Sequence, residues 1–522
     1  MSCGTLATPT VTNQSGYLSP MGARQSAGRS LPIVLYPIAT PIAAVLYLSA
    51  SVGSHPLWVI RPVFAAIVVC LLITATLTSL VGDKHRAGIT AWAVIVGLTV
   101  DDLRLSLLLL GVGGLLLAIG LAARRTPWRL GPRVTSAMLV FAIVLLAASL
   151  LRAMQAGALQ ADIDEIMFDL GREPPAPAPL STLPDVYVLL LDAYPGVVAA
   201  RSEPSFDSAM FSDALAFRGF DVAANARSNY LTTRLTLQSV FGARHAPDVE
   251  GLHPGTREQD ARALRLATDG GVALRVLGSM GYERIAIPSG YVELGPMRVD
   301  RLVVPSELTE MELGIMRVTG AGNVVKVISP DYVEAEARSR VLGTFDAAGA
   351  IAEEAHDLPR FVFIHVPAPH APWVADASGN LVLSGSTAGA SERAQDAKRR
   401  FFDYATWVGH LTVATIDRIL AASSGPPIIA VFSDHGPDFA FDDNDPLASD
   451  LDTRTSNFMA LLTPDHGQLL PDDATPINLF PYILNPYLQA DLPIQPNTIW
   501  GWRTNSSILD FVEIDPVTWK AR

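Results

Sequence analysis

Four places in the chain carry side chains suited to binding a divalent metal or attacking a phosphate ester. Three of them end or follow short apolar runs, and they hold Asp192, His365 with His370, and Ser433-Asp434-His435-Gly436. In a parallel sheet, ligands bind beyond the carboxyl ends of the strands. Carboxylates and imidazoles gathered at such an edge predict a metal site. Taken singly, each residue also fits a plainer role, because an Asp can cap a turn and a His can lie satisfied in the core.

The fourth place is a polar loop, beginning at Ser228-Asn229-Tyr230, that leads into an expected helix. Thr232 and Thr233 lie where this helix starts. A threonine here can be an N-cap. It can also be a nucleophile, because a helix N-terminus favours a bound phosphate and a nearby cation activates a hydroxyl.

The elements around these residues indicate an α/β domain with a mostly parallel sheet. The continuous apolar runs 186–191, 361–366 and 428–432 are typical of central parallel strands. Amphipathic helices are expected between them, for example at 207–218, 259–279 and 401–422. The Pro-rich segment 153–183, with a short helical stretch at 161–170, is expected to be a connector, and 376–398 and 442–453 to be surface loops.

Charge divides the chain into two parts. Hydrophobic residues make up 49% and charged residues 17%, against about 25% charged in a typical soluble domain. Residues 1–152 hold 11 Lys/Arg and 3 Asp/Glu, whereas residues 153–522 hold 27 and 48. A single soluble domain is excluded, and the acidic part argues against a nucleic-acid partner. The chain has only two cysteines, both in the first part, so the second part needs no disulfide.

The first part is expected to span a membrane. Its apolar runs are 32–52, 62–81, 88–100, 105–122 and 134–151, and most approach the about 20 residues that cross a bilayer. Fusing the third and fourth runs would give four spans, while a turn at Asp101-Asp102 gives five. Five spans place every basic loop in the cytoplasm. We therefore expect a cytoplasmic leader at 1–31, a transmembrane domain at 32–152 and an exterior domain after it.

The four motifs, in this order, resemble the alkaline phosphatase-like superfamily, specifically its membrane-anchored sulfatase-like branch. The first metal strand of that family resembles 184–192, and its nucleophile segment resembles 233–239. The family's other two elements resemble 363–372 and 433–436. The layout is similar to that of lipoteichoic acid synthases and phosphoethanolamine transferases. The resemblance implies a sulfatase-like catalytic domain over 184–510.

The resemblance also implies roles for individual residues. The implied metal ligands are Asp192, Thr233, Asp434 and His435, with Thr233 as the covalent nucleophile. The implied substrate-binding residues are His370, His365, Asn229 and Arg454. Thr233 is preferred over Thr232 because it keeps the family's spacing to Thr236 and Ser239, although Leu235 replaces the family's proline.

One divalent metal is expected, with Mn²⁺ or Zn²⁺ suiting carboxylate, imidazole and hydroxyl ligands better than Ca²⁺. Formylglycine sulfatases need Cys or Ser at the nucleophile position, and this chain has Thr233 there. The expected function is therefore transfer of a phospho-head group from a membrane lipid to a cell-envelope glycan or lipid through a phosphothreonine. The alternatives are hydrolysis of a phosphodiester or sulfate ester, and a non-catalytic envelope scaffold.

Overall fold

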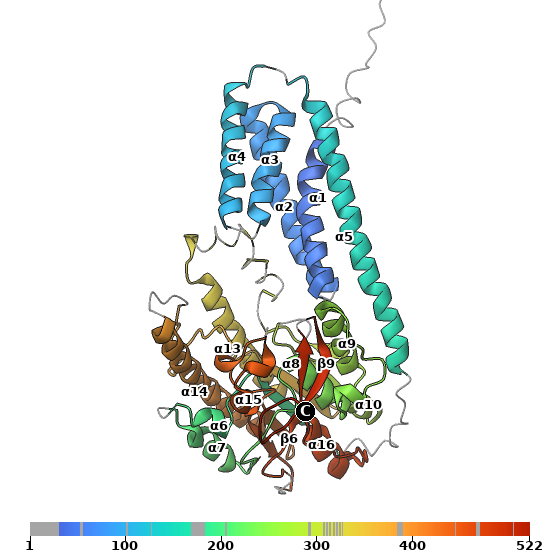
Figure 1. Cartoon of the computed structure of the whole chain (residues 1–522), viewed down its shortest axis with the longest axis vertical. Coiled ribbons are helices and arrows are strands. Elements are labelled where there is room, and N and C mark those ends of the chain that lie inside the picture. Colours follow the sequence, from blue (N-terminus) through green and yellow to red (C-terminus); the bar gives the residue numbers. More distant parts are fainter. Residues whose placement is uncertain are drawn as a thin grey trace, which may run out of the picture.

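The computed structural model shows a helical bundle joined to an α/β domain (Figure 1). It describes residues 31–522 except 53–55, 101–102, 127, 169–182, 204–205, 291–293, several positions between 306 and 326, 384–389, 444, 466–469 and 505. The expected leader, the Asp101-Asp102 turn and most of the Pro-rich connector therefore lie outside the described residues.

The bundle contains five helices close to the five apolar runs. They are α1 (Leu31–Val52), α2 (Pro56–Val81), α3 (Lys84–Thr99), α4 (Leu103–Ala122) and α5 (Gly131–Phe168). Three stretches are long and apolar enough to cross a membrane by length and composition, namely Val59–Val81, Arg104–Ala122 and Gly131–Arg152. The number of membrane crossings thus stays a prediction.

Basic residues gather at one end of this bundle. Asp83 caps α3 by accepting hydrogen bonds from the backbone N–H groups of His85 and Arg86. The Arg86 guanidinium donates to the carbonyls of Ala123 (2.6 Å) and Thr126 (2.8 Å), at the end of α4. The connection between α4 and α5 lies at the end of the bundle away from the α/β domain (Figure 1).

Helix α5 is a single helix of 38 residues. The separate helical stretch expected at 161–170 is largely its last part, because nothing in that sequence breaks the helix before Phe168. No proline or glycine occurs between Ala158 and Leu170, and Gly171 and Pro174 follow.

The α/β domain is built on a seven-stranded sheet in the order β2-β7-β6-β1-β5-β3-β4. The strands are β1 (Val186–Leu191), β2 (Asp221–Val222), β3 (Glu283–Ile287), β4 (Arg301–Leu302), β5 (Arg360–Val366), β6 (Ile428–Phe432) and β7 (Met459–Leu462). Central β1 pairs in parallel with β5 and β6, whereas β7 is antiparallel to β6 and β2 to β7. The predicted mostly parallel sheet is confirmed.

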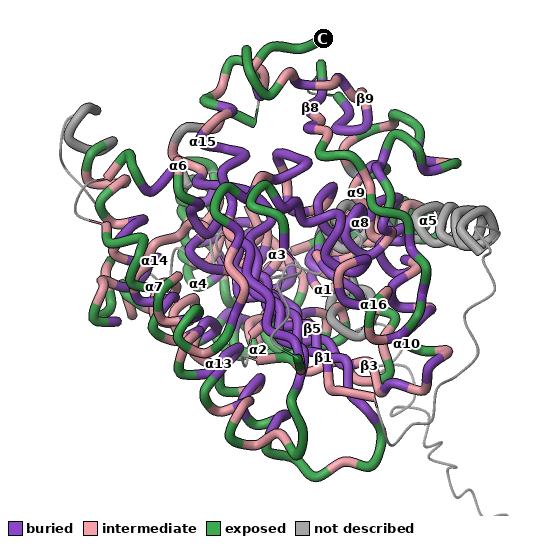
Figure 2. The backbone as a smooth tube through the Cα atoms, turned by 90° about the horizontal axis from the view of Figure 1, so that it is seen from below, coloured by how far each residue is buried: buried purple, intermediate pink, exposed green. Residues whose placement is uncertain are grey.

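Helices cover both faces of the sheet. Val186, Val188 and Leu190 of β1 pack towards α8 (Thr233–Gly242), α10 (Val272–Ser279) and α16 (Leu479–Leu488). The alternate residues Tyr187 and Leu189 pack towards α7 (Ser208–Ala216), α13 (Tyr332–Glu353) and α14 (Ala390–Ala422). A strand buried on both faces needs apolar residues throughout. Figure 2 shows these central strands side by side and buried.

Shorter elements complete the domain. They are α6 (Val197–Ala200), α9 (Arg257–Asp269), α15 (Leu451–Thr455), the 3₁₀ turns η2 (Ala246–Asp248), η3 (Asp438–Ala440), η4 (Pro446–Ala448) and η5 (Pro476–Asn478), and the hairpin of β8 (Ile499–Thr504) and β9 (Ser507–Ile514). Strand β9 runs past the expected boundary at 510.

The helix expected at 259–279 is two helices, α9 and α10, which meet at Gly270-Gly271. A Cβ on Gly271 would lie 2.5 Å from the carbonyl oxygen of Phe241. Only glycine allows the chain to turn that close to the end of α8.

Candidate functional site

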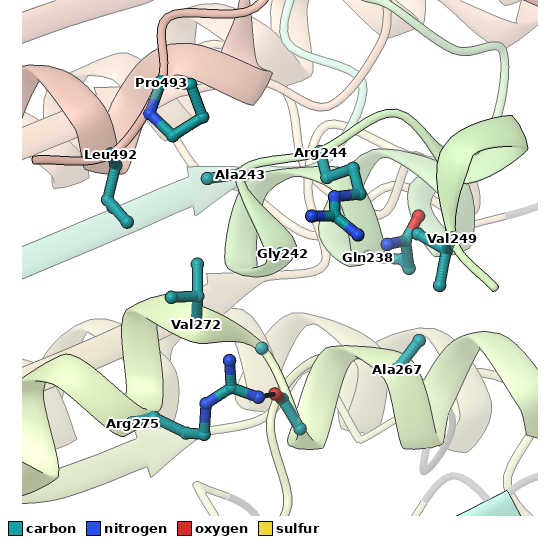
Figure 3. Close-up of a pocket in the computed structure, with 12 residues that line it drawn as sticks. Gln238, Gly242, Ala243, Arg244, Val249, Ala267, Val272, Arg275, Leu492 and Pro493 are labelled. Carbon is teal, nitrogen blue, oxygen red and sulfur yellow. Dashed lines mark hydrogen bonds between the residues drawn. The ribbon is translucent and has the colours of Figure 1, made fainter. Parts of the chain in front are cut away.

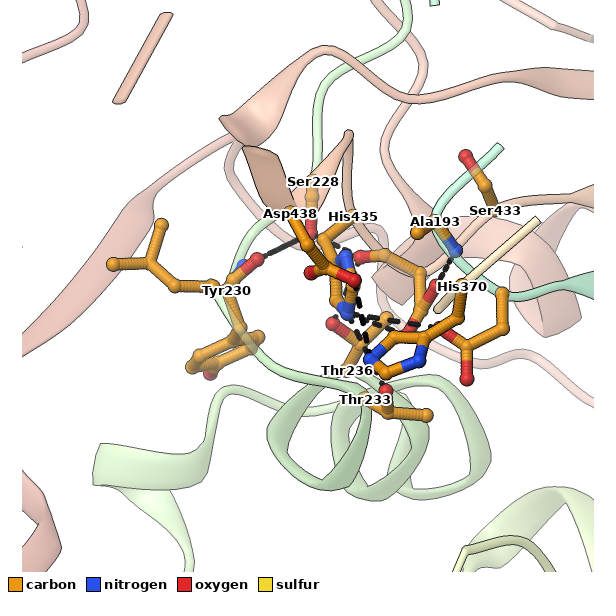
Figure 4. A network of polar contacts seen from close by, with 12 residues as sticks. Ala193, Ser228, Tyr230, Thr233, Thr236, His370, Ser433, His435 and Asp438 are labelled. Atoms are coloured by element: carbon orange, nitrogen blue, oxygen red, sulfur yellow. Dashed lines mark hydrogen bonds and ion pairs between the residues drawn. The ribbon is translucent and has the colours of Figure 1, made fainter. Parts of the chain in front are cut away.

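Three side chains able to bind a metal converge at the carboxyl edge of the sheet. Asp192 follows β1, and Asp434 and His435 follow β6, the neighbouring strand. One ligand atom from each lies within 4.8 Å of the others. All three residues are buried. Figure 4 shows His435 above the start of helix α8, within this network of polar contacts.

Two carboxylate oxygens of this cluster are acceptors that lack donors. Oδ1 of Asp192 and Oδ2 of Asp434 are buried and have no hydrogen-bond partner among the described residues. Nδ1 of His435 lies 2.9 Å from the Gly436 carbonyl oxygen, which can only accept, so Nδ1 carries the proton. The lone pair on Nε2 then faces Oδ2 of Asp434 at 3.1 Å. Two carboxylate oxygens and an imidazole lone pair directed at one another fit a divalent cation.

Backbone contacts hold the Asp434 side of the cluster in place. The N–H of Ala193 donates to Oδ1 of Asp434 (3.1 Å), and Ala193 adopts a left-handed backbone with φ of 64° to do so. The hydroxyls of Ser228 and Thr236 donate to the Asp434 carbonyl. The next residue, Gly436, must be glycine, because a Cβ there would lie 2.2 Å from a neighbouring backbone carbonyl oxygen.

Thr233 is the first residue of α8 and brings a hydroxyl to the cluster. Its Oγ1 lies 3.4 Å from Nε2 of His435 (Figure 4). Thr232 is the N-cap residue, but its side chain makes no capping hydrogen bond and its hydroxyl has no partner among the described residues. The geometry thus favours Thr233 over Thr232. It also puts that hydroxyl at the positive end of the helix.

His365 and Asp192 are neighbours across the sheet. His365, on β5, is fully buried, and its Nε2 lies 3.4 Å from Oδ2 of Asp192. Burial raises the pKa of Asp192, but His370, His365 and His435 lower it more, so the net shift is downward. Asp192 therefore stays ionised, and His365 contacts this carboxylate rather than open space.

His370 lies at the rim of the cluster. Its Nδ1 is 2.8 Å from the Ala371 carbonyl oxygen and its Nε2 is 3.1 Å from Oδ2 of Asp438. Burial lowers the pKa of His370, whereas Asp192 and Asp438 raise it, and the result is about 9. Both ring nitrogens can then carry protons and donate, so the ring is a cation at neutral pH.

Arg454 locks the surrounding loops. Its guanidinium donates to the Leu231 carbonyl (3.0 and 2.7 Å), to the Gly436 carbonyl (3.2 Å) and to Asp438. It also lies over the ring of Phe441, 4.1 Å from the centroid. Arg454 is buried, and these contacts give it a positioning role beside the cluster.

Asp438 is the residue that the sequence reading missed. Its carboxylate bridges His370 and Arg454. Burial raises the pKa of Asp438, but the charges of His370 and Arg454 lower it by a larger amount. The net pKa is below the usual value, so the carboxylate remains charged. The only sequence signal was its place three residues after His435, and its partner His370 lies far away along the chain.

Asn229 does not join the cluster. Its side-chain nitrogen donates to the Thr498 carbonyl (3.1 Å), and its side-chain oxygen accepts from the N–H of Ile477 (3.3 Å). Both ends of the amide are therefore occupied by backbone groups of the C-terminal segment. These contacts hold Asn229 against the C-terminal segment, and its contact with substrate stays a prediction.

Fold and site together define an α/β domain with a buried candidate metal centre, attached to a bundle of apolar helices. No protein-family model matches the chain, and no curated protein matches it.

Several solved structures are similar. The C-terminal periplasmic domain of EcEptC from Escherichia coli, in complex with zinc, has 12% identity and a TM-score of 0.43, covering 62% of this chain and 93% of that one. The soluble domain of lipooligosaccharide phosphoethanolamine transferase A from Neisseria meningitidis has 14% identity and a TM-score of 0.37, covering 60% and 89%. BT1596, a 2-O GAG sulfatase, has 13% identity and a TM-score of 0.38, covering 60% and 72%.

Proposed function

We propose that this protein is a membrane-anchored, metal-dependent enzyme that transfers a phospho-head group from a lipid to a cell-envelope acceptor. One observation carries the proposal. The unpartnered carboxylate oxygens of Asp192 and Asp434 lie close to Nε2 of His435, and the Thr233 hydroxyl meets them at the start of a helix. A nucleophile, a cation site and an anion-favouring helix end together suit phosphoryl transfer.

Asp192, Asp434, His435 and Thr233 would hold one divalent metal. A donor set of two carboxylates, an imidazole and a hydroxyl suits Mn²⁺ or Zn²⁺ better than Ca²⁺. The bound metal would supply positive charge that stabilises the phosphoryl oxygens and the Thr233 oxygen.

Thr233 performs the proposed chemistry in two steps. Its hydroxyl proton passes to water, and Oγ1 forms a bond to the phosphorus of the lipid phosphodiester. The bond from phosphorus to the lipid alcohol breaks, which leaves the head group on Thr233. The oxygen of the acceptor hydroxyl then bonds to the same phosphorus, the bond from phosphorus to Oγ1 breaks, and Oγ1 takes a proton back from water.

His370 would handle the proton of the alcohols. Because its ring carries a proton at neutral pH, it gives that proton to the departing lipid oxygen in the first step. It recovers a proton from the acceptor hydroxyl in the second step. Asp438 and Arg454 keep His370 in place, and His365 keeps Asp192 in place.

The helices supply the setting for a lipid donor. We propose five crossings with the N-terminus in the cytoplasm, because the basic loops share the end of the bundle away from the α/β domain (Figure 1). The α/β domain then lies outside the cytoplasm, at the surface where lipid head groups are concentrated.

Hydrolysis remains the second candidate, with water as acceptor in the second step and a phosphodiester or sulfate ester as substrate. A non-catalytic scaffold is disfavoured, because it would leave two buried carboxylate oxygens without partners or purpose.

The first test is detection of the covalent intermediate. The full-length protein is incubated with Mn²⁺ and phospholipids, quenched in acid and analysed by mass spectrometry. We expect a phospho-head-group adduct on Thr233, which is lost in Thr233→Ala and kept in the matched neighbour Thr232→Ala. Full turnover by Thr233→Ala would refute the nucleophile.

A second measurement separates transfer from hydrolysis. The labelled head group is followed from the lipid, with and without an added envelope glycan or lipid acceptor. Label on the acceptor supports a transferase, whereas label released as a free head group supports a hydrolase. Chelation of divalent metal should stop both.

A further inference from the structure

The segment between β4 and α13 carries an apolar surface that the proposed chemistry does not use. Val327 and Ile328, which lie just before the start of α13, are 83% and 78% exposed. The other large apolar side chains of the described α/β domain that are this exposed, Phe217 and Val517, stand singly. Single exposed apolar side chains are common on protein surfaces, whereas a contiguous apolar patch indicates a surface that binds a partner.

The composition of this segment differs from that of the domain around it. Residues 311–328 hold ten apolar side chains, two basic ones and one acidic one. Residues 153–522 as a whole hold 27 Lys/Arg and 48 Asp/Glu. Anionic lipids repel an acidic domain, but they attract a segment that is apolar and carries a small excess of basic residues. The segment therefore has the chemistry of a contact with a membrane surface.

An ion pair joins the same segment to the helical bundle. Oε1 of Glu312 lies 3.3 Å from Nε of Arg61 in α2. Arg61 is near the beginning of the apolar stretch Val59–Val81, which is long enough to cross a membrane. An arginine near the end of a span places its charge at the membrane surface. With the bundle in a membrane, as proposed, Glu312 lies where the hydrocarbon core begins.

The direction of α13 brings the exposed pair to the same level. Helix α13 points its first residues towards the bundle, and the yellow segment just before it reaches the level of the lower end of α4 (Figure 1). The helix that Phe217 follows, α7, lies in the part of the domain farthest from the bundle (Figure 1). The segment that holds Val327 and Ile328 therefore faces the membrane, whereas Phe217 does not.

A cavity elsewhere in the domain offers a less suitable contact for lipid. The cavity between α8 and α10 has a volume of about 150 Å³, and Arg244 and Arg275 are among the residues that line it (Figure 3). A hydrocarbon chain in this cavity would remove water from charged groups, which is unfavourable. The exposed pair before α13 brings no charged side chain of its own into hydrocarbon.

We propose that Val327 and Ile328 insert into the membrane surface and give the α/β domain a direct contact with lipid. Their side chains would leave water for hydrocarbon, while Glu312 and Arg61 stay at the level of the head groups. Helices α5 and α1 contact α9, on the other side of the domain from α13 (Figure 1). A lipid contact before α13 would therefore fix the tilt of the domain. The inference rests on the proposed membrane topology but not on the chemistry at Thr233.

The test measures how often a nitroxide spin label collides with oxygen, which concentrates in hydrocarbon, and with a water-soluble nickel complex. The full-length protein in nanodiscs of phosphatidylcholine and phosphatidylglycerol carries Cys3→Ser and Cys70→Ala, which remove both native cysteines. For a label on Ile328→Cys we expect frequent collisions with oxygen and few with the nickel complex. Phe64→Cys, on an exposed residue of α2, is the lipid control, and Phe217→Cys is the water control.

A charge beside the label tests whether apolar character drives the contact. Val327→Asp should change the label at position 328 to the pattern of the water control, because a carboxylate is disfavoured in hydrocarbon. Val517→Asp is the matched control, because this valine of the C-terminal segment is 84% exposed. It should leave the lipid pattern at position 328 unchanged, and an equal effect of the two substitutions would contradict the proposal.

The other outcomes at position 328 would overturn the proposal. The water pattern without Val327→Asp would show that the segment does not meet lipid. Few collisions with either reagent would show that a protein, for example a second copy of this chain, covers the surface. The label at position 64 separates these results from failure of the proposed topology, because loss of its lipid pattern would count against the membrane-spanning bundle itself. Failure of Thr233 labelling would leave all of these patterns unchanged.

Discussion

Replacing Asp434 with Asn should change the stability of the protein in opposite directions with and without metal. Asp192 and Asp434 present carboxylate oxygens within 4.8 Å of each other in a buried site. At an effective dielectric constant of about 20, two ionised groups at that distance repel by about 3 kcal/mol. In metal-free protein, Asp434→Asn removes this repulsion. The nearby histidines offset part of it, so 3 kcal/mol is an upper value.

The asparagine can keep the local hydrogen bonds. Its Oδ1 can accept from the N–H of Ala193, as the carboxylate does. Its side-chain nitrogen would occupy the place of Oδ2, which lies 3.1 Å from the Nε2 lone pair of His435, and would donate to it. No buried polar group loses a partner, so metal-free Asp434→Asn should be more stable than metal-free wild type.

Metal should reverse that order. At a metal concentration of about 1,000 times the Kd, wild type gains about 4.1 kcal/mol, which exceeds the upper value for the repulsion. The variant lacks one anionic ligand and gains much less. The assay is thermal unfolding followed by tryptophan fluorescence, with and without Mn²⁺, and the control is Asp346→Asn, whose side chain is 83% exposed. A variant that is less stable than wild type without metal, or equally stabilised by it, would refute the reasoning.

Three further predictions concern the surroundings of the site. Gly436→Ala should abolish metal binding, measured by calorimetry, because its Cβ would meet a backbone carbonyl oxygen at 2.2 Å. Asp438→Asn should lower kcat by at least tenfold with little change in KM, because His370 and Arg454 lose the carboxylate that joins them. His245 is buried and its pKa is lowered mainly by burial. Its stabilising effect is therefore present above about pH 6.5 and is lost as the pH falls towards its lower folded pKa, so thermal unfolding at pH 7.5 and 5.5 should differ less in His245→Gln than in wild type.

The elements predicted best from the sequence are the strands whose burial requires apolar residues. Strands β1, β5 and β6 are buried on both faces, so their composition shows the apolar run directly. Strand β7 has only four residues, and its antiparallel pairing depends on a loop whose course no local pattern specifies. The break between α9 and α10 depends on a close approach to Phe241 that is visible only in three dimensions.

The residues of the candidate site also fall into those that local sequence predicts and those that depend on distant contacts. Asp192, Asp434 and His435 were predictable because the end of a parallel strand fixes where the next side chain points. Asp438 was not, because its role comes from His370 on a different loop. The hydrogen bonds of Asn229 to the C-terminal segment have no counterpart in local sequence.

The length of α5 has a consequence for how the α/β domain can move. Its 38 residues extend about 57 Å, nearly twice the about 30 Å of a hydrocarbon core. The excess of about 27 Å is continuous helix, and α5 and α1 both contact α9. Because both α5 and α1 contact it, the α/β domain has little freedom to rotate about its attachment to the bundle. It would therefore meet lipids and acceptors from one fixed angle, and diffusion in the plane of the membrane would set how often it meets them.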